Sequence, residues 1–200
     1  MTDFNLAAFL TLVIVTTYTP GPNNISSASM GVLHGYKRTL PYILGIFTGF
    51  YLIMLICGLI STLVLRVLPS FEVVLRIVGA VYILWLAYHT LKTSYNFQEK
   101  DHSALKYWNG LLLQIFNLKV ILYGLTIFST FLAYTAKQPF ILILYALFLA
   151  SNSFASTSLW ALFGSVIRKY LHQPRVQQMV NLILALLLVY TAVEISGVLG

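Results

Sequence analysis

Acidic residues are scarce in this 200-residue chain, which contains five Asp and Glu beside twelve Lys and Arg. Charged residues of both signs make up 8% of the sequence, whereas a soluble domain carries about 25%. With 59% hydrophobic residues, the chain has too few charges to cover a globular surface in water. These shortages exclude soluble enzymes, nucleic-acid-binding proteins and disordered proteins. They predict a membrane protein in which every backbone polar group is bonded internally.

Cysteine and histidine are too few to indicate a reactive or metal-binding centre. The single cysteine, Cys57, lies in an apolar run and has no second cysteine with which to form a disulfide. The four histidines, His34, His89, His102 and His172, fall in predicted loops or at helix ends. We therefore expect no enzyme activity, no metal and no cofactor.

Six apolar runs are long enough to cross a bilayer as helices, which takes about 20 residues each. The runs are Phe4–Leu33, Leu40–Leu65, Phe71–Leu91, Gly110–Tyr134, Phe140–Ile167 and Val176–Leu199. Their connections are short except for residues 92–106, so the chain has no room for a soluble domain. The sequence predicts an all-α polytopic membrane protein with six transmembrane helices, folded as a single domain over residues 1–200.

The basic residues predict the orientation of the chain in the membrane. The first, third and fifth predicted loops contain Lys37, Arg38, Lys92, Lys100, Lys106, Arg168, Lys169 and Arg175. The second and fourth loops contain Arg66 and Lys137. Because basic residues are retained on the cytoplasmic side, the odd loops face the cytoplasm and both termini face outward. The net charge of +7 has the same origin and does not indicate a nucleic-acid partner.

The first run is interrupted by Thr19-Pro20-Gly21-Pro22-Asn23-Asn24. Each proline lacks a backbone N–H and clashes with the preceding turn, so the segment cannot remain a regular helix. We expect two half-helices, with Asn23 and Asn24 capping the start of the second. A helix N-terminus offers free N–H donors and a partial positive charge, which suit a carboxylate. The alternative is a simple proline kink.

A second interruption lies in the fourth run, at Gln114-Ile115-Phe116-Asn117-Leu118-Lys119. The Lys119 ammonium starts near the middle of the bilayer, where a charge costs from about 2.5 to more than 10 kcal/mol. We interpret Lys119 and Asn117 as functional, and Tyr123, one turn later on the same face, as a residue that orients Lys119. The alternatives are a lysine that reaches the membrane surface and a Tyr123 that fills apolar space.

The two interruptions occupy corresponding places in the two halves of the chain. Asn23 lies in the first of six runs, and Asn117 lies in the fourth, about 95 residues further along. Three helices per half make the second half enter the membrane from the opposite side. The sequence therefore predicts a 3+3 inverted repeat with a broken first helix, with halves at about 1–95 and 106–200. Interrupted helices in matching positions are typical of a transporter's substrate site.

Two further features allow less specific interpretations. A polar patch at Ser151–Ser158 in the fifth run either lines a substrate path or bonds carbonyls of its own helix, and the sequence leaves both open. Gly45 and Gly49 form a G-x-x-x-G motif, which indicates close packing of two helices without any ligand.

Three motifs resemble the LysE/RhtB family of amino-acid exporters. They are Pro20-Gly21-Pro22-Asn23-Asn24, Gly35-Tyr36-Lys37-Arg38 and the Gly45/Gly49 pair, and the resemblance extends over essentially the whole chain. Many members carry Asn-Pro-Lys in the fourth helix, where this chain has Leu118 between Asn117 and Lys119. The departure removes the proline and leaves the sharpness of the second break open. The stretches Asn117–Phe131 and Asn181–Val193 resemble the subgroup that exports cysteine and O-acetylserine.

The resemblance implies a secondary active exporter of small neutral amino acids in the bacterial inner membrane, driven by the proton gradient. We expect the substrate to bind at Pro20, Gly21, Pro22, Asn23, Asn24, Asn117, Lys119 and Tyr123. The carboxylate would meet the helix start and Lys119, and the amine would use carbonyls freed before Pro20. Lys119 and Glu194 are the candidates for proton coupling, since no carboxylate lies at mid-depth of a predicted span.

Other functions stay open at this point. The same scaffold also suits export of homoserine, threonine or leucine, and a passive amino-acid channel would be built from similar helices. The expected partners are the amino acid, protons and the lipid bilayer. The sequence does not decide whether the protein forms a homo-oligomer.

Overall fold

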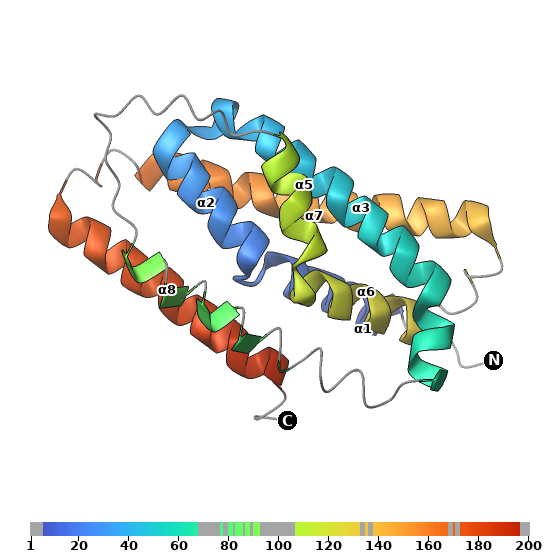
Figure 1. Cartoon of the computed structure of the whole chain (residues 1–200). Helices are drawn as coiled ribbons and strands as arrows, with labels where there is room; N and C mark the ends of the chain where they lie inside the picture. Colours follow the sequence, from blue (N-terminus) through green and yellow to red (C-terminus); the bar gives the residue numbers. More distant parts are fainter. Residues whose placement is uncertain are drawn as a thin grey trace.

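The computed structural model describes residues 6–67, 77, 80–81, 83–85, 87–88, 90–92, 107–132, 135, 138–167, 170 and 173–196. The elements of this part are all helices (Figure 1). They are α1 (Leu6–Tyr18), α2 (Pro22–His34), α3 (Tyr36–Val67), α5 (Tyr107–Ile115), α6 (Leu118–Thr130), α7 (Pro139–Ile167) and α8 (Pro174–Ser196). Three of them begin with a proline, which fits the first helical position because its missing N–H would have no helical partner there.

The described helices confirm an all-helical membrane protein. Helices α3, α7 and α8 are long and apolar enough to cross a membrane, and α5 with α6 makes a fourth span if the bent pair is counted as one. The first predicted run is split into α1 and α2. The third run, Phe71–Leu91, lies largely outside the described residues. The count of six spans and the 3+3 repeat stay predictions.

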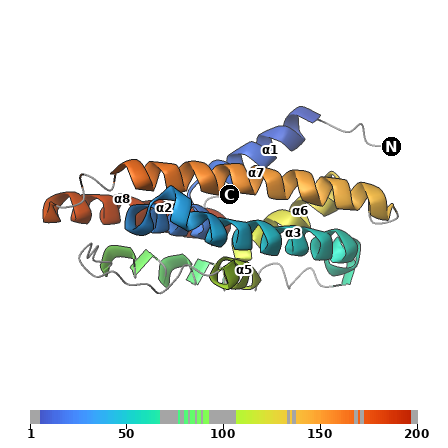
Figure 2. The same ribbon diagram turned by 90° about the horizontal axis from the view of Figure 1, so that it is seen from above.

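Helices α3 and α7 pack against each other along the length of the bundle (Figure 1). Helix α2 packs against both, and α5 and α6 pack against α3. Helix α1 contacts α7 and then leaves it at an angle, so that its N-terminal end projects from the bundle (Figure 2). This arrangement brings the α1–α2 break and the α5–α6 break to the same part of the molecule.

Glycines allow α3 and α5 to approach each other at backbone distance. A Cβ atom at Gly45 would lie 1.9 Å from the Tyr107 carbonyl oxygen. A Cβ atom at Gly110 would lie 2.0 Å from the Tyr42 carbonyl oxygen, so each helix supplies a glycine to the crossing. The interpretation of Gly45 as a helix-packing residue is confirmed.

Helices α2 and α7 cross in the same way. A Cβ atom at Gly31 would lie 2.1 Å from the Ala161 carbonyl oxygen, and one at Gly164 would lie 2.1 Å from that of Ala28. In lipid, helices gain little from removing apolar surface from their surroundings, so close van der Waals packing of this kind holds them together.

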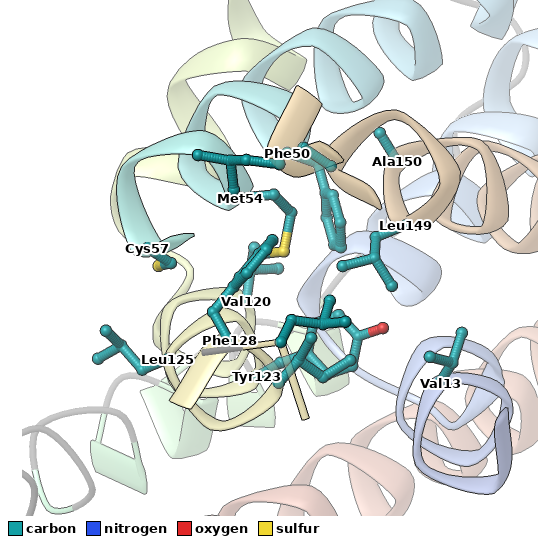
Figure 3. Close-up of a cluster of buried hydrophobic side chains, with 14 of the residues drawn as sticks. Val13, Phe50, Met54, Cys57, Val120, Tyr123, Leu125, Phe128, Leu149 and Ala150 are labelled. Atoms are coloured by element: carbon teal, nitrogen blue, oxygen red, sulfur yellow. The ribbon is translucent and has the colours of Figure 1, made fainter. Parts of the chain in front are cut away.

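The largest apolar cluster lies between α1, α3, α6 and α7 (Figure 3). Its fully buried members include Met54 and Phe128, and Phe50, Val120 and Tyr123 belong to the same cluster. A second cluster joins Ile25 of α2 to residues of α8 and to described residues between 80 and 87. The first cluster forms an apolar wall beside the two helix breaks.

Candidate substrate-binding site

The first helix breaks where the sequence predicts. Helix α1 ends at Tyr18 and α2 begins at Pro22, while Gly21 between them is fully extended (φ −176°, ψ 176°). The prediction that Asn23 and Asn24 cap α2 is wrong. Gly21 occupies the N-cap position, and no side chain caps the helix. Because Pro22 is the first helical residue, both asparagines lie within the first turn, and their side chains bind neighbouring elements instead.

Asn24 closes the end of α1. Its Nδ2 donates to the carbonyl oxygens of Thr17 (2.9 Å) and Thr19 (2.8 Å), both of which the break leaves without helical partners. The Ser156 hydroxyl of α7 lies 2.9 Å from the same Thr17 oxygen and 3.1 Å from Asn24 Oδ1. The break is therefore held by one asparagine from α2 and one serine from α7.

The remaining carbonyls before α2 also have partners, which corrects the expectation that they are free to bind an amine. Trp160 Nε1 donates to the Tyr18 oxygen at 3.3 Å. The Pro20 oxygen is contacted by the Thr191 hydroxyl of α8 at 2.7 Å and accepts from Lys119 Nζ at 3.1 Å. A substrate amine must displace or join one of these groups, because a buried carbonyl is normally paired.

The second break is sharp although it contains no proline. Helices α5 and α6 meet at 62°. Asn117 has non-helical dihedral angles (φ −83°, ψ 86°), and its side chain accepts a hydrogen bond from Val120 N at 3.4 Å. An N-capping asparagine thus starts a new helix at Leu118 without a proline.

A cluster of three buried amides connects the two breaks. Asn23 and Gln114 exchange two hydrogen bonds of 2.9 and 3.0 Å, and Asn117 Nδ2 donates to Asn23 Oδ1 at 2.7 Å. All three residues are at least 91% buried. The sequence assigns no role to Gln114. The sequence feature that could have pointed to Gln114 is its position: it is an amide within an apolar run, three residues before Asn117.

Lys119 turns toward the first break. Its Nζ donates to Thr19 Oγ1 at 3.0 Å and to the Pro20 oxygen at 3.1 Å. A Cβ atom at Gly21 would lie 3.0 Å from Lys119 Cδ and 3.3 Å from Nζ, so the glycine makes room for the lysine. The ammonium thus lies beside the N-terminus of α2.

A small cavity lies between the two breaks, with a volume of about 40 Å³. It is lined by Thr16, Thr17, Thr19, Gly21, Pro22, Asn23, Asn24, Phe50, Asn117, Lys119, Val120, Tyr123 and Ser153. It has room for a few water molecules, so it must widen to admit an amino acid. Its polar groups are hydroxyls, amides and an ammonium, a set that suits a zwitterionic organic solute and not a metal cation.

Most of the predicted site residues meet at this cavity. Of the eight, Pro20 alone does not line it, and its carbonyl binds Lys119. Tyr123 lines the cavity, but its hydroxyl makes no hydrogen bond to Lys119 or to any other described residue. The backbone of Glu194 belongs to α8, and its side chain lies outside the described part of the chain.

The serine patch divides between the two interpretations that the sequence leaves open. Ser153 lines the cavity and Ser156 contacts the first break. Ser151 and Asn152 instead donate to carbonyls of their own helix, at 2.8 and 2.9 Å. The face of α7 that carries Ser153 and Ser156 is the one turned toward the site.

The chain is similar to known membrane transport proteins. Residues 14–196 match the family described as LysE type translocator. The cysteine/O-acetylserine efflux protein of Klebsiella pneumoniae is 38% identical over 196 residues, which cover 98% of each chain. Proteins of the same name from Salmonella choleraesuis and Escherichia coli are 36% and 35% identical, over 98% of this chain and 99% of theirs. No solved structure matches the chain.

Proposed function

This chain belongs to the LysE type translocator family, and from that premise we propose that it exports cysteine and O-acetylserine across the bacterial inner membrane. The family makes it a transporter and not an enzyme. The proposal rests mainly on one observation: the Lys119 ammonium binds the α1–α2 break and lines a cavity between this break and the α5–α6 break. The names of the relatives support the two substrates.

The substrate carboxylate binds at the start of α2. The first backbone N–H groups of a helix have no partner within it, and Pro22 leaves those of Asn23 and Asn24 as the first available donors. The helix dipole and the nearby Lys119 ammonium both favour a negative charge there. A partly buried ammonium and a helix start together make a stronger anion site than either alone.

The substrate amine takes the place that Lys119 holds in the empty site. Thr19 Oγ1 and the Pro20 oxygen surround an ammonium, and the α-ammonium of an amino acid has the same chemistry. When the substrate enters, the lysine leaves these acceptors to the substrate and turns to the carboxylate beside them. The exchange keeps both acceptors paired and widens the cavity at the same time.

Two inverted halves of one transmembrane domain then move around this site. Helices α2 and α6 each contain 13 residues, each follows a break, and both contribute to the cavity. Such broken helices in matching positions favour alternating access by rocking of the two halves. With the odd loops in the cytoplasm, both termini face the periplasm.

The proton gradient drives export, with Lys119 and Glu194 as the candidate coupling residues. One charge moved through about 100 mV releases about 2.3 kcal/mol, which supports a concentration ratio of roughly 50.

Inside-out membrane vesicles test the proposal directly. We expect them to accumulate labelled cysteine and O-acetylserine, and we expect an uncoupler to abolish the accumulation. Threonine, homoserine and leucine serve as competing substrates, and vesicles without the protein serve as the control. Accumulation of one of the competing amino acids alone would contradict the substrate assignment. Flux that only runs downhill and ignores the uncoupler would indicate a passive channel.

A further inference from the structure

Two buried hydroxyl groups face the cavity without hydrogen-bond partners. Tyr123 is 6% exposed, and its hydroxyl has no partner among the described residues. Thr17 Oγ1 on α1 lies next to the Tyr123 hydroxyl, and neither group has another partner among the described residues. Figure 3 shows the Tyr123 hydroxyl pointing away from α6, toward α1. Buried hydroxyls are normally fully paired, so two hydroxyls that line a cavity with at most each other as partners indicate a ligand group.

The surroundings of these hydroxyls are apolar. The Phe50 ring lies 6.1 Å from the Tyr123 ring, and Val120 lines the same cavity. Lys119 lies one helical turn before Tyr123 on the same face of α6, and both residues line the cavity. A substrate bound through its charged groups at Lys119 can therefore direct its side chain toward Tyr123.

We propose that Tyr123 and Thr17 form the subsite for the side chain of the exported amino acid, and that this subsite selects a short side chain bearing a hydrogen-bond acceptor. The proposal rests on the proposed function and adds to it the residues that determine specificity. A side chain with an acceptor pairs the buried hydroxyls, whereas an apolar one of the same shape leaves them unpaired. Sites that bind a substrate through buried polar groups reject analogues that lack the matching group.

The two substrates should differ in their dependence on Tyr123. The ester carbonyl of O-acetylserine is a full acceptor for the tyrosine hydroxyl, whereas a thiol sulfur is a weak one. Tyr123→Phe removes the hydroxyl and keeps the ring. We expect it to lower the rate of O-acetylserine uptake at limiting concentration about tenfold and that of cysteine about twofold.

The test compares O-acetylserine with O-ethylserine, which has the same chain length but no ester carbonyl. Inside-out vesicles containing wild type, Tyr123→Phe or Thr17→Val are assayed with both compounds and with cysteine. The matched control is Tyr145→Phe, which removes a hydroxyl from a tyrosine of α7 that faces Phe9 and lies outside the cavity. We expect the wild type and the control to prefer O-acetylserine at least tenfold, and Tyr123→Phe to reduce that preference to about twofold or less.

The outcomes separate this inference from the function on which it rests. An unchanged preference in both Tyr123→Phe and Thr17→Val would overturn the subsite, and so would an equal loss for all three compounds. The second pattern would indicate a structural role for the hydroxyls. Absence of wild-type accumulation would instead overturn the proposed function and the subsite with it.

Discussion

Replacing Lys119 by alanine is expected to abolish efflux of cysteine and O-acetylserine while the protein remains folded in the membrane. Lys119 contributes the ammonium at the α1–α2 break and two hydrogen bonds, to Thr19 and Pro20. Losing each of these hydrogen bonds destabilises the folded protein by about 1 to 3 kcal/mol. Removing a charge from the membrane interior is favourable and offsets part of this loss, so the protein should remain folded. Uptake into inside-out vesicles, normalised to the amount of protein, measures the effect.

The matched control for Lys119 is Lys92→Ala. Lys92 is exposed and contacts the ring and hydroxyl of Tyr88, far along the chain from either break. We expect this variant to transport at the wild-type rate. Full efflux by Lys119→Ala would remove the lysine from the mechanism, and a loss of membrane-inserted protein would show that its role is structural.

Replacing Gly164 by leucine is expected to prevent the bundle from assembling. A Cβ atom at this position would lie 2.1 Å from the Ala28 carbonyl oxygen and 3.1 Å from its Cα. Because the neighbouring atoms are backbone, no side chain can rotate out of the way, and α2 must separate from α7. Overpacking usually costs about 1 to 3 kcal/mol, and a helix crossing that must open should exceed that range. Thermal unfolding and size-exclusion chromatography in detergent report the loss.

Ala155→Leu provides the control for Gly164→Leu on the same helix. Ala155 is an exposed residue of α7, so a larger apolar side chain there does not enter the helix crossing. We expect unchanged unfolding temperature and a single monodisperse species. If Gly164→Leu behaves like this control, the close α2–α7 crossing is not required for folding.

The sequence predicts the positions of both helix breaks because their causes are local. Prolines on both sides of Gly21 exclude a regular helix, and an asparagine followed by Leu118 and Lys119 gives a new helix start. Lys119 is also recognisable without a structure, since a charge within a long apolar run needs a partner or a function. These features predict most of the residues that line the cavity.

The hydrogen-bond partners of Asn23 and Asn24 cannot be predicted from the sequence, because they depend on tertiary contacts. A first-turn asparagine caps its own helix or binds a neighbour with similar ease, and local rules favour the cap. Only the tertiary arrangement, in which α2 packs against α3 and α7, decides that Asn23 binds Gln114 and that Asn24 binds the end of α1. The same packing pairs the carbonyls that the break exposes, which an analysis of α1 alone leaves free.

The central claim is that the substrate carboxylate binds Lys119 at the α1–α2 break. Solid-state NMR in lipid bilayers tests it by measuring the dipolar coupling between 13C-carboxyl-labelled cysteine and 15Nζ-labelled lysine. A direct hydrogen bond places the two nuclei roughly 4 Å apart. We predict a coupling of that size in the wild type and its disappearance in Lys119→Ala. A coupling that persists in the variant, or bound cysteine with no coupling in the wild type, would contradict the account.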